Sequence, residues 1–266
     1  MLRYPVCRTP LARQRKNYRC DRGHSFDIAR SGYVNLLRSG SRRSRGDDAR
    51  MLRSRRAFLE RGFYQPLLSI MAGRTSTRSQ GSPLRLLDVG CGEGYFTAGL
   101  AQGQVPGSEV WGVDISRLAV DMGARRHPRL GFAVASARDL PILTGAVDFL
   151  ACIFGPHEPL EYRRVLAPAG LAIIVRPGAD HLIELRRMLY RDLQPPGRRD
   201  DSDAWEGLRV VERSELRYSM QLREEDRLNL LAMTPYTWSG GKDSQLLALT
   251  AAEVTAHFQL VEVGPD

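Results

Sequence analysis

A short run of glycines and acidic residues is the part of this chain best suited to chemistry. Leu86–Phe96 reads as an apolar strand ending in Asp88, then a loop with glycine at every second position, then the start of a helix. A second acid, Asp114, closes the next apolar stretch. At the carboxyl ends of parallel strands, such a loop lets backbone approach a nucleotide-like ligand, and the second acid accepts hydrogen bonds from ribose hydroxyls. The residues expected to surround this ligand are Asp88, Gly90, Gly92, Gly94 and Asp114.

The glycine spacing indicates which ligand is expected. Dinucleotide folds use G-x-G-x-x-G to bring a helix N-terminus to a pyrophosphate, whereas this loop reads G-x-G-x-G. It resembles the first motif of class I S-adenosylmethionine methyltransferases, whose ligand has no phosphate. The resemblance implies that the glycines receive the methionine end of the ligand and that Asp114 holds its ribose. A tight turn in a Rossmann-like core, or a dinucleotide site, is the alternative.

Alternating strands and helices must position these residues. The pattern predicts strands near 85–89, 109–113, 131–135, 147–153 and 170–175, with helices near 95–102, 117–126, 159–166 and 180–191. Such alternation is typical of an α/β fold with a parallel sheet between two helical layers. We therefore expect residues 84–266 to form a Rossmann-like class I methyltransferase domain, with a mostly parallel seven-stranded sheet and helices on both faces.

The flanking segments carry weaker signals. Residues 1–37 have turns of their own and form a small module, and residues 38–83 join it to the large domain. In that joining segment we expect a basic loop over 38–50, helices over 49–60 and 64–72 and a loop over 73–83. Beyond the alternating region we expect a loop over 194–207, a strand pair over 208–222, helices near 224–232 and 244–256 and a strand near 257–263.

The N-terminal module contains a candidate metal site. Cys7, Cys20 and His24 have the ligand types and the spacing of a structural zinc site, and so small a segment has little core to hold it together without a metal. The C-x-x-C that should supply the fourth ligand has Tyr4 in place of its first cysteine. Three alternatives follow: a water completes the shell, Asp21 or Asp27 completes it, or the module has lost zinc and is held by aromatic packing of Tyr4, Tyr18 and Phe26.

Charge and composition restrict the function classes. The net charge is +9, and residues 1–61 hold 17 Lys and Arg against 5 Asp and Glu, so the whole excess lies in the first quarter. This asymmetry favours a polyanion partner, most simply nucleic acid; a solvated arginine-rich surface is the alternative. No apolar run is long enough to span a membrane, no signal peptide is expected, and four cysteines do not indicate a disulfide scaffold. We therefore expect a cytoplasmic protein.

The parts together resemble the bacterial 23S ribosomal RNA (guanine-N1)-methyltransferases of the RlmA type, nearly from end to end. Apart from the glycine loop, the resemblance is carried by His24-Ser25-Phe26-Asp27, Gly32-Tyr33-Val34-Asn35-Leu36-Leu37, Arg55-Arg56-Ala57-Phe58-Leu59, Gly62-Phe63-Tyr64-Gln65-Pro66-Leu67, Pro177-Gly178-Ala179-Asp180-His181 and Met233-Thr234-Pro235-Tyr236-Thr237-Trp238. The chain departs from the family at Tyr4 and in the loop Phe154-Gly155-Pro156-His157, where alanine-proline-cysteine is usual.

The resemblance implies an activity and a set of contacts. The enzyme would methylate N1 of a guanine in a 23S ribosomal RNA hairpin lining the peptide exit tunnel, its N-terminal module would grip RNA, and it would be a homodimer. The family's cofactor contacts carry over to Tyr64, Gly92, Glu93 and His181. Its zinc ligands carry over to Cys7, Cys20 and His24.

The sequence does not single out a catalytic base. Guanine N1 must lose a proton, and Asp180, His157 and His181 lie near expected strand ends without a distinguishing spacing. Tyr64, Tyr236 and Trp238 are aromatic candidates for stacking on a flipped base or on the adenine, with a core role as the alternative. The competing functions are a macrolide-resistance-type relative acting on a neighbouring guanine, a non-catalytic RNA-binding relative and a small-molecule methyltransferase.

Overall fold

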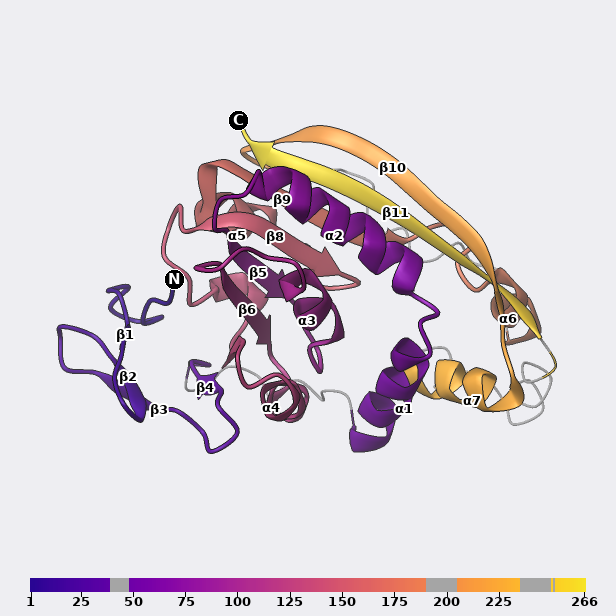
Figure 1. The fold of residues 1–266 in the computed structure, drawn as a ribbon, viewed down its shortest axis with the longest axis horizontal. Helices are drawn as coiled ribbons and strands as arrows, with labels where there is room; N and C mark the ends of the chain where they lie inside the picture. Colours follow the sequence, from indigo (N-terminus) through magenta and orange to yellow (C-terminus); the bar gives the residue numbers. More distant parts are fainter. Residues whose placement is uncertain (39–47, 190–204, 235–249, 251) are drawn as a thin grey trace.

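The computed structural model describes residues 1–38, 48–189, 205–234, 250 and 252–266 (Figure 1). Within these residues the chain forms a three-stranded sheet at its N-terminal end and a large eight-stranded sheet. In Figure 1 the N-terminal strands lie beside the edge of the large sheet that carries β7 and β4, away from the long C-terminal strands. The site residues predicted from the sequence therefore come from both parts of the molecule.

The large sheet has the strand order β10-β11-β9-β8-β5-β6-β7-β4. Neighbours from β4 to β9 are parallel, and β11 is antiparallel to both β9 and β10. The mostly parallel sheet is confirmed. Its strands after the N-terminal module are β5 (Arg85–Val89), β6 (Glu109–Asp114), β7 (Gly131–Val134), β8 (Val147–Ile153), β9 (Leu166–Pro177), β10 (Leu208–Gln221) and β11 (Glu253–Pro265).

The N-terminal module contributes a strand to the large sheet. Its own antiparallel sheet consists of β1 (Ala12–Arg13), β2 (Asn17–Arg19) and β3 (Ser25–Asp27). The next strand, β4 (Val34–Asn35), instead pairs parallel with β7. The predicted count of seven strands is therefore wrong by one. The backbone groups along the outer edge of β7 were open to pairing, and β4 satisfies them.

Most predicted helices are present, with bounds close to those expected. Asp48 and Ser116 cap two of them, each accepting a hydrogen bond from a backbone N–H of the first turn. The helices are α1 (Ala49–Glu60), α2 (Gln65–Ser79), α3 (Tyr95–Ala101), α4 (Arg117–Arg126), α5 (Pro159–Val165), α6 (Ile183–Leu189) and α7 (Glu224–Met233), with a 3₁₀ turn η1 (Ala137–Asp139).

Three local predictions are wrong. The expected loop over 73–83 is helical as far as Ser79, because Met71, Thr75 and Ser79 recur every four residues and form one buried face of the helix. The expected strand pair over 208–222 is the single strand β10, whose partner β11 comes from the end of the chain. That strand includes residues 253–256, where a helix was expected; residues 244–249 and 251 of that helix, and 194–204 of the expected loop, lie outside the described residues.

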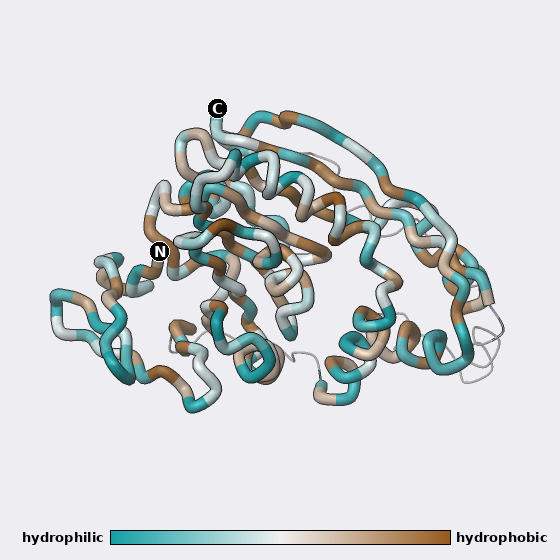
Figure 2. The backbone as a smooth tube through the Cα atoms, in the orientation of Figure 1, coloured by the Kyte–Doolittle hydropathy of each residue, from teal (hydrophilic) through white to brown (hydrophobic). Residues whose placement is uncertain are grey.

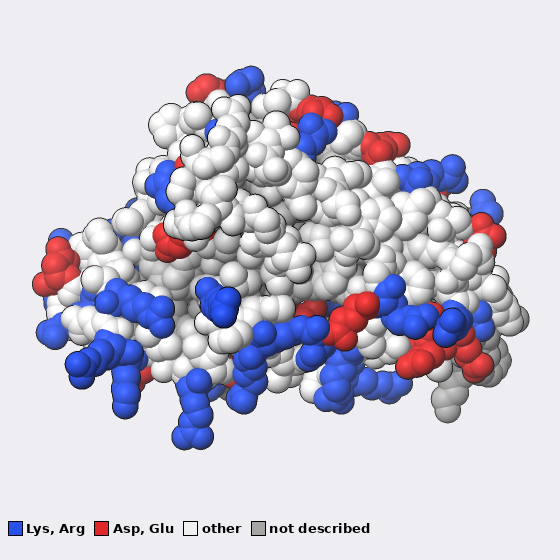
Figure 3. Space-filling view, in the orientation of Figure 1, with Lys and Arg blue, Asp and Glu red and all other residues white. Residues whose placement is uncertain are grey.

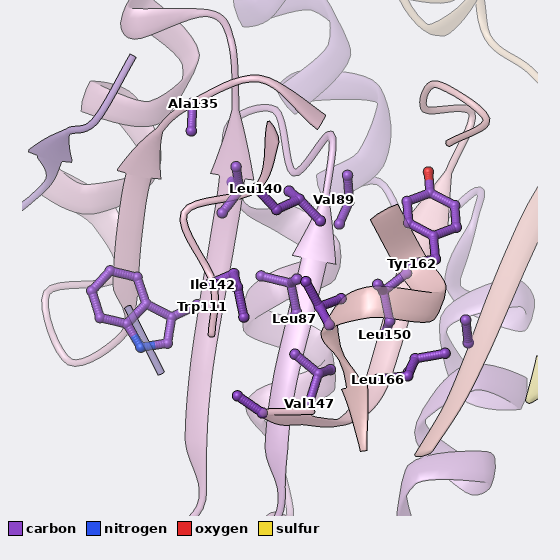
Figure 4. Close-up of a cluster of buried hydrophobic side chains, with 14 of the residues drawn as sticks. Leu87, Val89, Trp111, Ala135, Leu140, Ile142, Val147, Leu150, Tyr162 and Leu166 are labelled. Atoms are coloured by element: carbon purple, nitrogen blue, oxygen red, sulfur yellow. The ribbon is translucent and has the colours of Figure 1, made fainter. Parts of the chain in front are cut away.

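The two faces of the sheet bury different apolar clusters, because successive strand side chains point to opposite faces. Leu87, Leu150 and other residues of their face pack against α5 and against the N-terminal module (Figure 4). Leu86 and Phe149 pack on the other face, beneath α1, α2, α6 and α7. Figure 2 shows the central strands as mainly hydrophobic and the N-terminal strands as mainly hydrophilic.

A buried arginine attaches the module to the large domain. Arg3 is 5% exposed, its Nε donates to the Leu140 carbonyl at 3.3 Å, and its guanidinium lies 3.2 Å from Asp139 and 3.8 Å from Glu161. Tyr18 of the module also meets Trp111 of β6, with ring centroids 6.0 Å apart. The module is thus packed on the sheet that carries the glycine loop.

Candidate functional site

The glycine loop lies between the carboxyl ends of β5 and β6 and leads into α3. Gly90, Gly92 and Gly94 all have positive φ, at 77°, 55° and 88°. A Cβ at Gly94 would come within 2.9 Å of the Phe132 ring, so glycine is required there for space as well as for conformation. The loop therefore presents backbone, without side-chain bulk, at the end of β5.

Asp114 is held against this loop at the end of β6. One carboxylate oxygen accepts from the Gly92 N–H at 2.9 Å, and the other accepts from the Ser116 N–H at 2.8 Å. A carboxylate oxygen has two lone-pair directions, so each can also accept from one of two adjacent hydroxyls. A fixed carboxylate beside a bare backbone loop fits the ribose and methionine portions of S-adenosylmethionine.

Asp88 has a different place from the one expected. It is 2% exposed, and its carboxyl accepts from the Thr97 hydroxyl at 2.6 Å. Burial raises the pKa of Asp88 to about 7. Its hydrogen bond to Thr97 joins β5 to α3 and so fixes the two ends of the glycine loop. A direct contact of Asp88 with a ligand stays a prediction.

Side chains of helix α1, which is not part of the sheet, lie beside the glycine loop. Glu93 is 4% exposed; burial raises its pKa, while Arg126 and Arg56 act in the opposite direction. Those two arginines also pair with Glu60, which joins α1 to α4. Arg55 lies so close that a Cβ at Gly92 would be 3.6 Å from its guanidinium. Arg55 belongs to the basic excess of residues 1–61 that favours a nucleic-acid partner, and the structure places it beside the glycine loop.

Tyr64 and His181 are brought together although 117 positions separate them. The Tyr64 hydroxyl lies 3.4 Å from His181 Nε2, and His181 Nδ1 accepts from the His257 backbone N–H at 3.2 Å. Tyr64 is 3% exposed and His181 5%, and burial lowers the pKa of His181 to about 4. Both ring nitrogens of His181 already have hydrogen-bond partners, so neither offers a free lone pair to a substrate proton, which does not suit a general base.

The other two candidate bases also have partners. Asp180 lies 3.3 Å from Arg217, and His157 Nδ1 accepts from Arg176 at 3.1 Å. The His157 ring packs edge-on against Trp205, with centroids 4.7 Å apart. Tyr236 and Trp238 lie outside the described residues. The geometry thus gives none of these residues the role of base.

The loop after β8 is pressed against the glycine loop. A Cβ at Gly155 would lie 3.0 Å from the Val89 carbonyl oxygen, and a Cβ at Gly90 would lie 3.4 Å from the Gly155 Cα. Phe154 just before it is 44% exposed. Sequence reasoning noted this loop only for its departure from the family pattern, although an aromatic residue directly after a predicted strand was a usable signal.

The three metal-ligand candidates form one cluster. Cys7 Sγ lies 3.9 Å from Cys20 Sγ and 3.8 Å from His24 Nδ1, and the Cys20–His24 distance is 3.2 Å. At the usual bond lengths, two cysteine sulfurs on a tetrahedral zinc are about 3.8 Å apart, and a sulfur and an imidazole nitrogen are about 3.6 Å apart. The two distances from Cys7 are close to these values and the Cys20–His24 distance is shorter, so a small shift of His24 would bring the three donors to corners of such a site. Among the described residues, neither Asp21 nor Asp27 belongs to the group.

Aromatic packing occupies the side where the fourth ligand was expected. The Tyr4 ring lies 4.6 Å from the His24 ring and 4.7 Å from Phe26, centroid to centroid. The Thr9 hydroxyl lies 2.9 Å from Cys7 Sγ. Burial opposes ionisation of Cys20, but hydrogen bonds from His24 and Thr9 lower its pKa to about 6. The cluster therefore combines three candidate metal ligands, two cysteines and one histidine, with the aromatic packing that was the alternative to zinc.

Basic side chains gather along one edge of the molecule. Figure 3 shows them over the module, α4 and α1, with acidic side chains interspersed towards α7. Arg42, Arg43 and Arg45 lie outside the described residues. The exposed basic residues of the module and α1 include Arg8, Arg13, Arg15, Lys16, Arg19, Arg22, Arg30, Arg50 and Arg53. In the described part of the chain, no helix is both long and apolar enough to cross a membrane.

Two family models match separate parts of the chain. A family model described as "RlmA, N-terminal" matches residues 2–45, and one described as "Methyltransferase domain" matches residues 86–176. A 23S rRNA (guanine(748)-N(1))-methyltransferase of Streptomyces fradiae is 36% identical over 95% of this chain and 90% of its own length. The YcgJ protein of Bacillus subtilis, at 15% identity, matches 75% of this chain and 98% of its own with a TM-score of 0.51, which shows the fold alone.

Proposed function

The chain belongs to the family of 23S rRNA (guanine-N1)-methyltransferases, and on that premise we propose that it methylates N1 of a guanine in 23S ribosomal RNA. The observation that carries this proposal is the glycine loop with Asp114 fixed beside it. When bound, S-adenosylmethionine supplies an electrophilic methyl group on a sulfonium sulfur. That methyl group would leave the sulfur for guanine N1, whose proton would pass to solvent or to a base.

The residues around the loop would hold the cofactor. Asp114 would accept from the ribose hydroxyls, and Gly90, Gly92 and Gly94 would admit the methionine portion to the backbone. Glu93, Tyr64 and His181 would complete the site, as the family resemblance implies. Asp88 would support the glycine loop indirectly, through its hydrogen bond from Thr97. The assignments of Asp114 and the glycines are supported by the fit of their donor and acceptor groups to the cofactor, whereas those of Glu93, Tyr64 and His181 rest on the resemblance.

Positioning would account for most of the rate. The target base must leave its stack, and N1 must come into line with the transferred methyl group. Asp180, His157 and His181 are all engaged by other groups in this structure. We therefore assign no general base, and we attribute the rate acceleration by the protein to binding and orientation of the two substrates.

The N-terminal module would bind RNA. Its exposed arginines would contact phosphates without reading sequence, and its attachment through Arg3 would hold it at a constant distance from the glycine loop. Cys7, Cys20 and His24 would hold a structural zinc ion that stabilises the module. We keep the division into residues 1–37, 38–83 and 84–266 as a functional one, although β4 joins the first part to the sheet of the third.

The finer features of the function follow the family resemblance. We propose a hairpin lining the peptide exit tunnel as the substrate, a homodimer as the working form and the cytoplasm as its location. Two nucleotides are candidates for the methylated position: guanine 748, for which the relative from Streptomyces fradiae is named, and a neighbouring guanine. The two candidates differ in the nucleotide that acquires the methyl group.

Methyl transfer from labelled S-adenosylmethionine to 23S ribosomal RNA fragments tests the proposal. The expected result is one methyl group per RNA, located at guanine N1 by a block to reverse transcription, since methylation removes the N1–H that pairs. The nucleotide at the block separates the two candidates. Label on another atom, or on a small molecule instead of RNA, would refute the proposed function. Metal content of the same sample reports on the zinc site.

A further inference from the structure

We propose that Phe154 is the surface on which the flipped guanine stacks during methyl transfer. The inference deepens the proposed function and rests on it. It names a substrate-contacting residue in the loop after β8, a segment whose sequence departs from the family pattern. Exposure, backbone conformation, aromatic surroundings and position beside the glycine loop each support this role.

Phe154 is exposed in a way that packing does not explain. Its side chain is 44% exposed, whereas most aromatic residues near it are buried. Its backbone lies in the left-handed region, with φ of 54°, which is costly for a bulky residue. Such conformations persist where the surrounding structure enforces them, and they concentrate at functional sites. The strained backbone holds a large apolar ring at the surface, where little burial of the ring is available to offset the cost of the strain.

A floor of buried aromatic rings supports Phe154 from below. Its ring centroid lies 5.7 Å from His181, 5.8 Å from Phe258 and 6.4 Å from Tyr64. Its backbone N–H donates to the Val175 carbonyl at 3.0 Å, which ties the loop to β9. The ring is thus anchored on one side while part of its surface remains open, as a stacking surface must be.

The position of Phe154 matches the side from which the base must approach. Asp114, the expected ribose ligand, ends β6, and the glycine loop follows β5. In the strand order β9-β8-β5-β6, the strand on the other side of β5 is β8, and Phe154 directly follows β8. Gly155 presses this loop against Gly90. An acceptor base entering beside the glycine loop, on the side away from Asp114, therefore meets Phe154.

Other aromatic residues near the loop are less suited to this role. Tyr64 and Phe258 are buried, at 3% and 0% exposure, and form the floor. Tyr95 is half-buried, and its hydroxyl donates to Gln65. Stacking of a base on an aromatic ring requires no hydrogen-bond partner and tolerates any base. Phe154 would therefore hold the guanine in place, and recognition of guanine itself would lie elsewhere.

Substitution of Phe154 tests the proposal on the full-length protein and an RNA fragment that the wild type methylates. Phe154→Leu keeps the Cβ and apolar bulk and removes the π face, whereas Phe154→Tyr keeps that face. We expect Phe154→Leu to lower kcat/KM for RNA by about 5- to 150-fold, the range found when aromatic stacking partners of bases are truncated. Phe154→Tyr should stay within about threefold of wild type. Leu160→Ala, at a 64% exposed apolar residue six positions further along the chain, is the control and should have no effect.

A second measurement separates stacking from packing. The Kd for S-adenosylmethionine, measured by calorimetry, should be unchanged in Phe154→Leu, because the floor residues Tyr64 and His181 remain in place. Unchanged kcat/KM in Phe154→Leu, or a parallel loss of cofactor affinity, would overturn the inference. Failure of the wild type to methylate any guanine would instead refute the proposed function, so the two failures are distinguishable.

Discussion

Replacing Asp114 with alanine should sharply weaken binding of S-adenosylmethionine without unfolding the protein. The carboxylate already accepts the Gly92 and Ser116 backbone N–H groups, at 2.9 and 2.8 Å. It is therefore oriented before any ligand arrives, and little ordering is needed on binding. If each oxygen also accepts one ribose hydroxyl, as proposed, the substitution removes two hydrogen bonds to a charged group.

The expected magnitude follows from those two bonds. A hydrogen bond to a charged group contributes about 1.5–3 kcal/mol, so the loss is at least about 3 kcal/mol, or roughly 150-fold in Kd. The two freed backbone N–H groups lie at a partly exposed position, where water can replace the carboxylate. They should cost only about 1 kcal/mol each, which for a chain of this size lowers Tm by about 2–4 °C per kcal/mol.

Calorimetric titration with S-adenosylmethionine, alongside thermal unfolding, measures both effects. Glu109→Gln is the matched control. Glu109 is an acid at the other end of the same strand, far from the glycine loop, and it accepts a hydrogen bond from the Trp111 indole at 2.8 Å. This variant should bind the cofactor like wild type. A Kd for Asp114→Ala within about threefold of wild type would refute the assignment of Asp114 to the ribose, whatever the change in Tm.

Three further predictions concern metal binding and pH. Cys20→Ser should lower the zinc content of the purified protein, and Tyr4→Cys should slow zinc loss to a chelator by supplying a fourth thiolate; equal retention in both variants would contradict the assigned ligands. The pKa of Asp88 is raised from 3.8 to about 7, so the stability linked to its protonation is present in acid and is lost as pH rises from about 4 to 7, by up to about 4 kcal/mol. Urea unfolding of wild type and Asp88→Asn at pH 5 and 8 should show the part of this loss that falls between those two pH values, about 2.5 kcal/mol; a difference between the two proteins that is independent of pH would count against it. The pKa of His181 is lowered from 6.5 to about 4, so its stabilising effect is present above pH 6.5 and is lost on acidification to pH 4, by about 3 kcal/mol. His181→Gln should flatten that part of the stability profile, and an unaltered profile would argue that His181 charges freely.

Part of the fold and site could be predicted because the features are local. The glycine loop, the acid that ends β6 and the strands and helices around them follow from spacing within one strand-turn-helix unit. The sequence also predicted the cluster of Cys7, Cys20 and His24, because turns within the short N-terminal module bring these three residues together. The geometry of such features depends only on residues that are close to one another in the sequence.

Tertiary packing decided what distant segments do to one another. The pairing of β4 with β7, the place of Arg55 beside Gly92 and the contact of Tyr64 with His181 all join segments far apart in the sequence. No periodicity encodes such contacts, because they depend on which sheet edge is open and which helix crosses the site. The same holds for Phe154: its sequence position shows an aromatic residue after a strand. Only the packed sheet, with Gly155 pressed against Gly90 and buried rings beneath, leaves that ring partly exposed beside the cofactor loop.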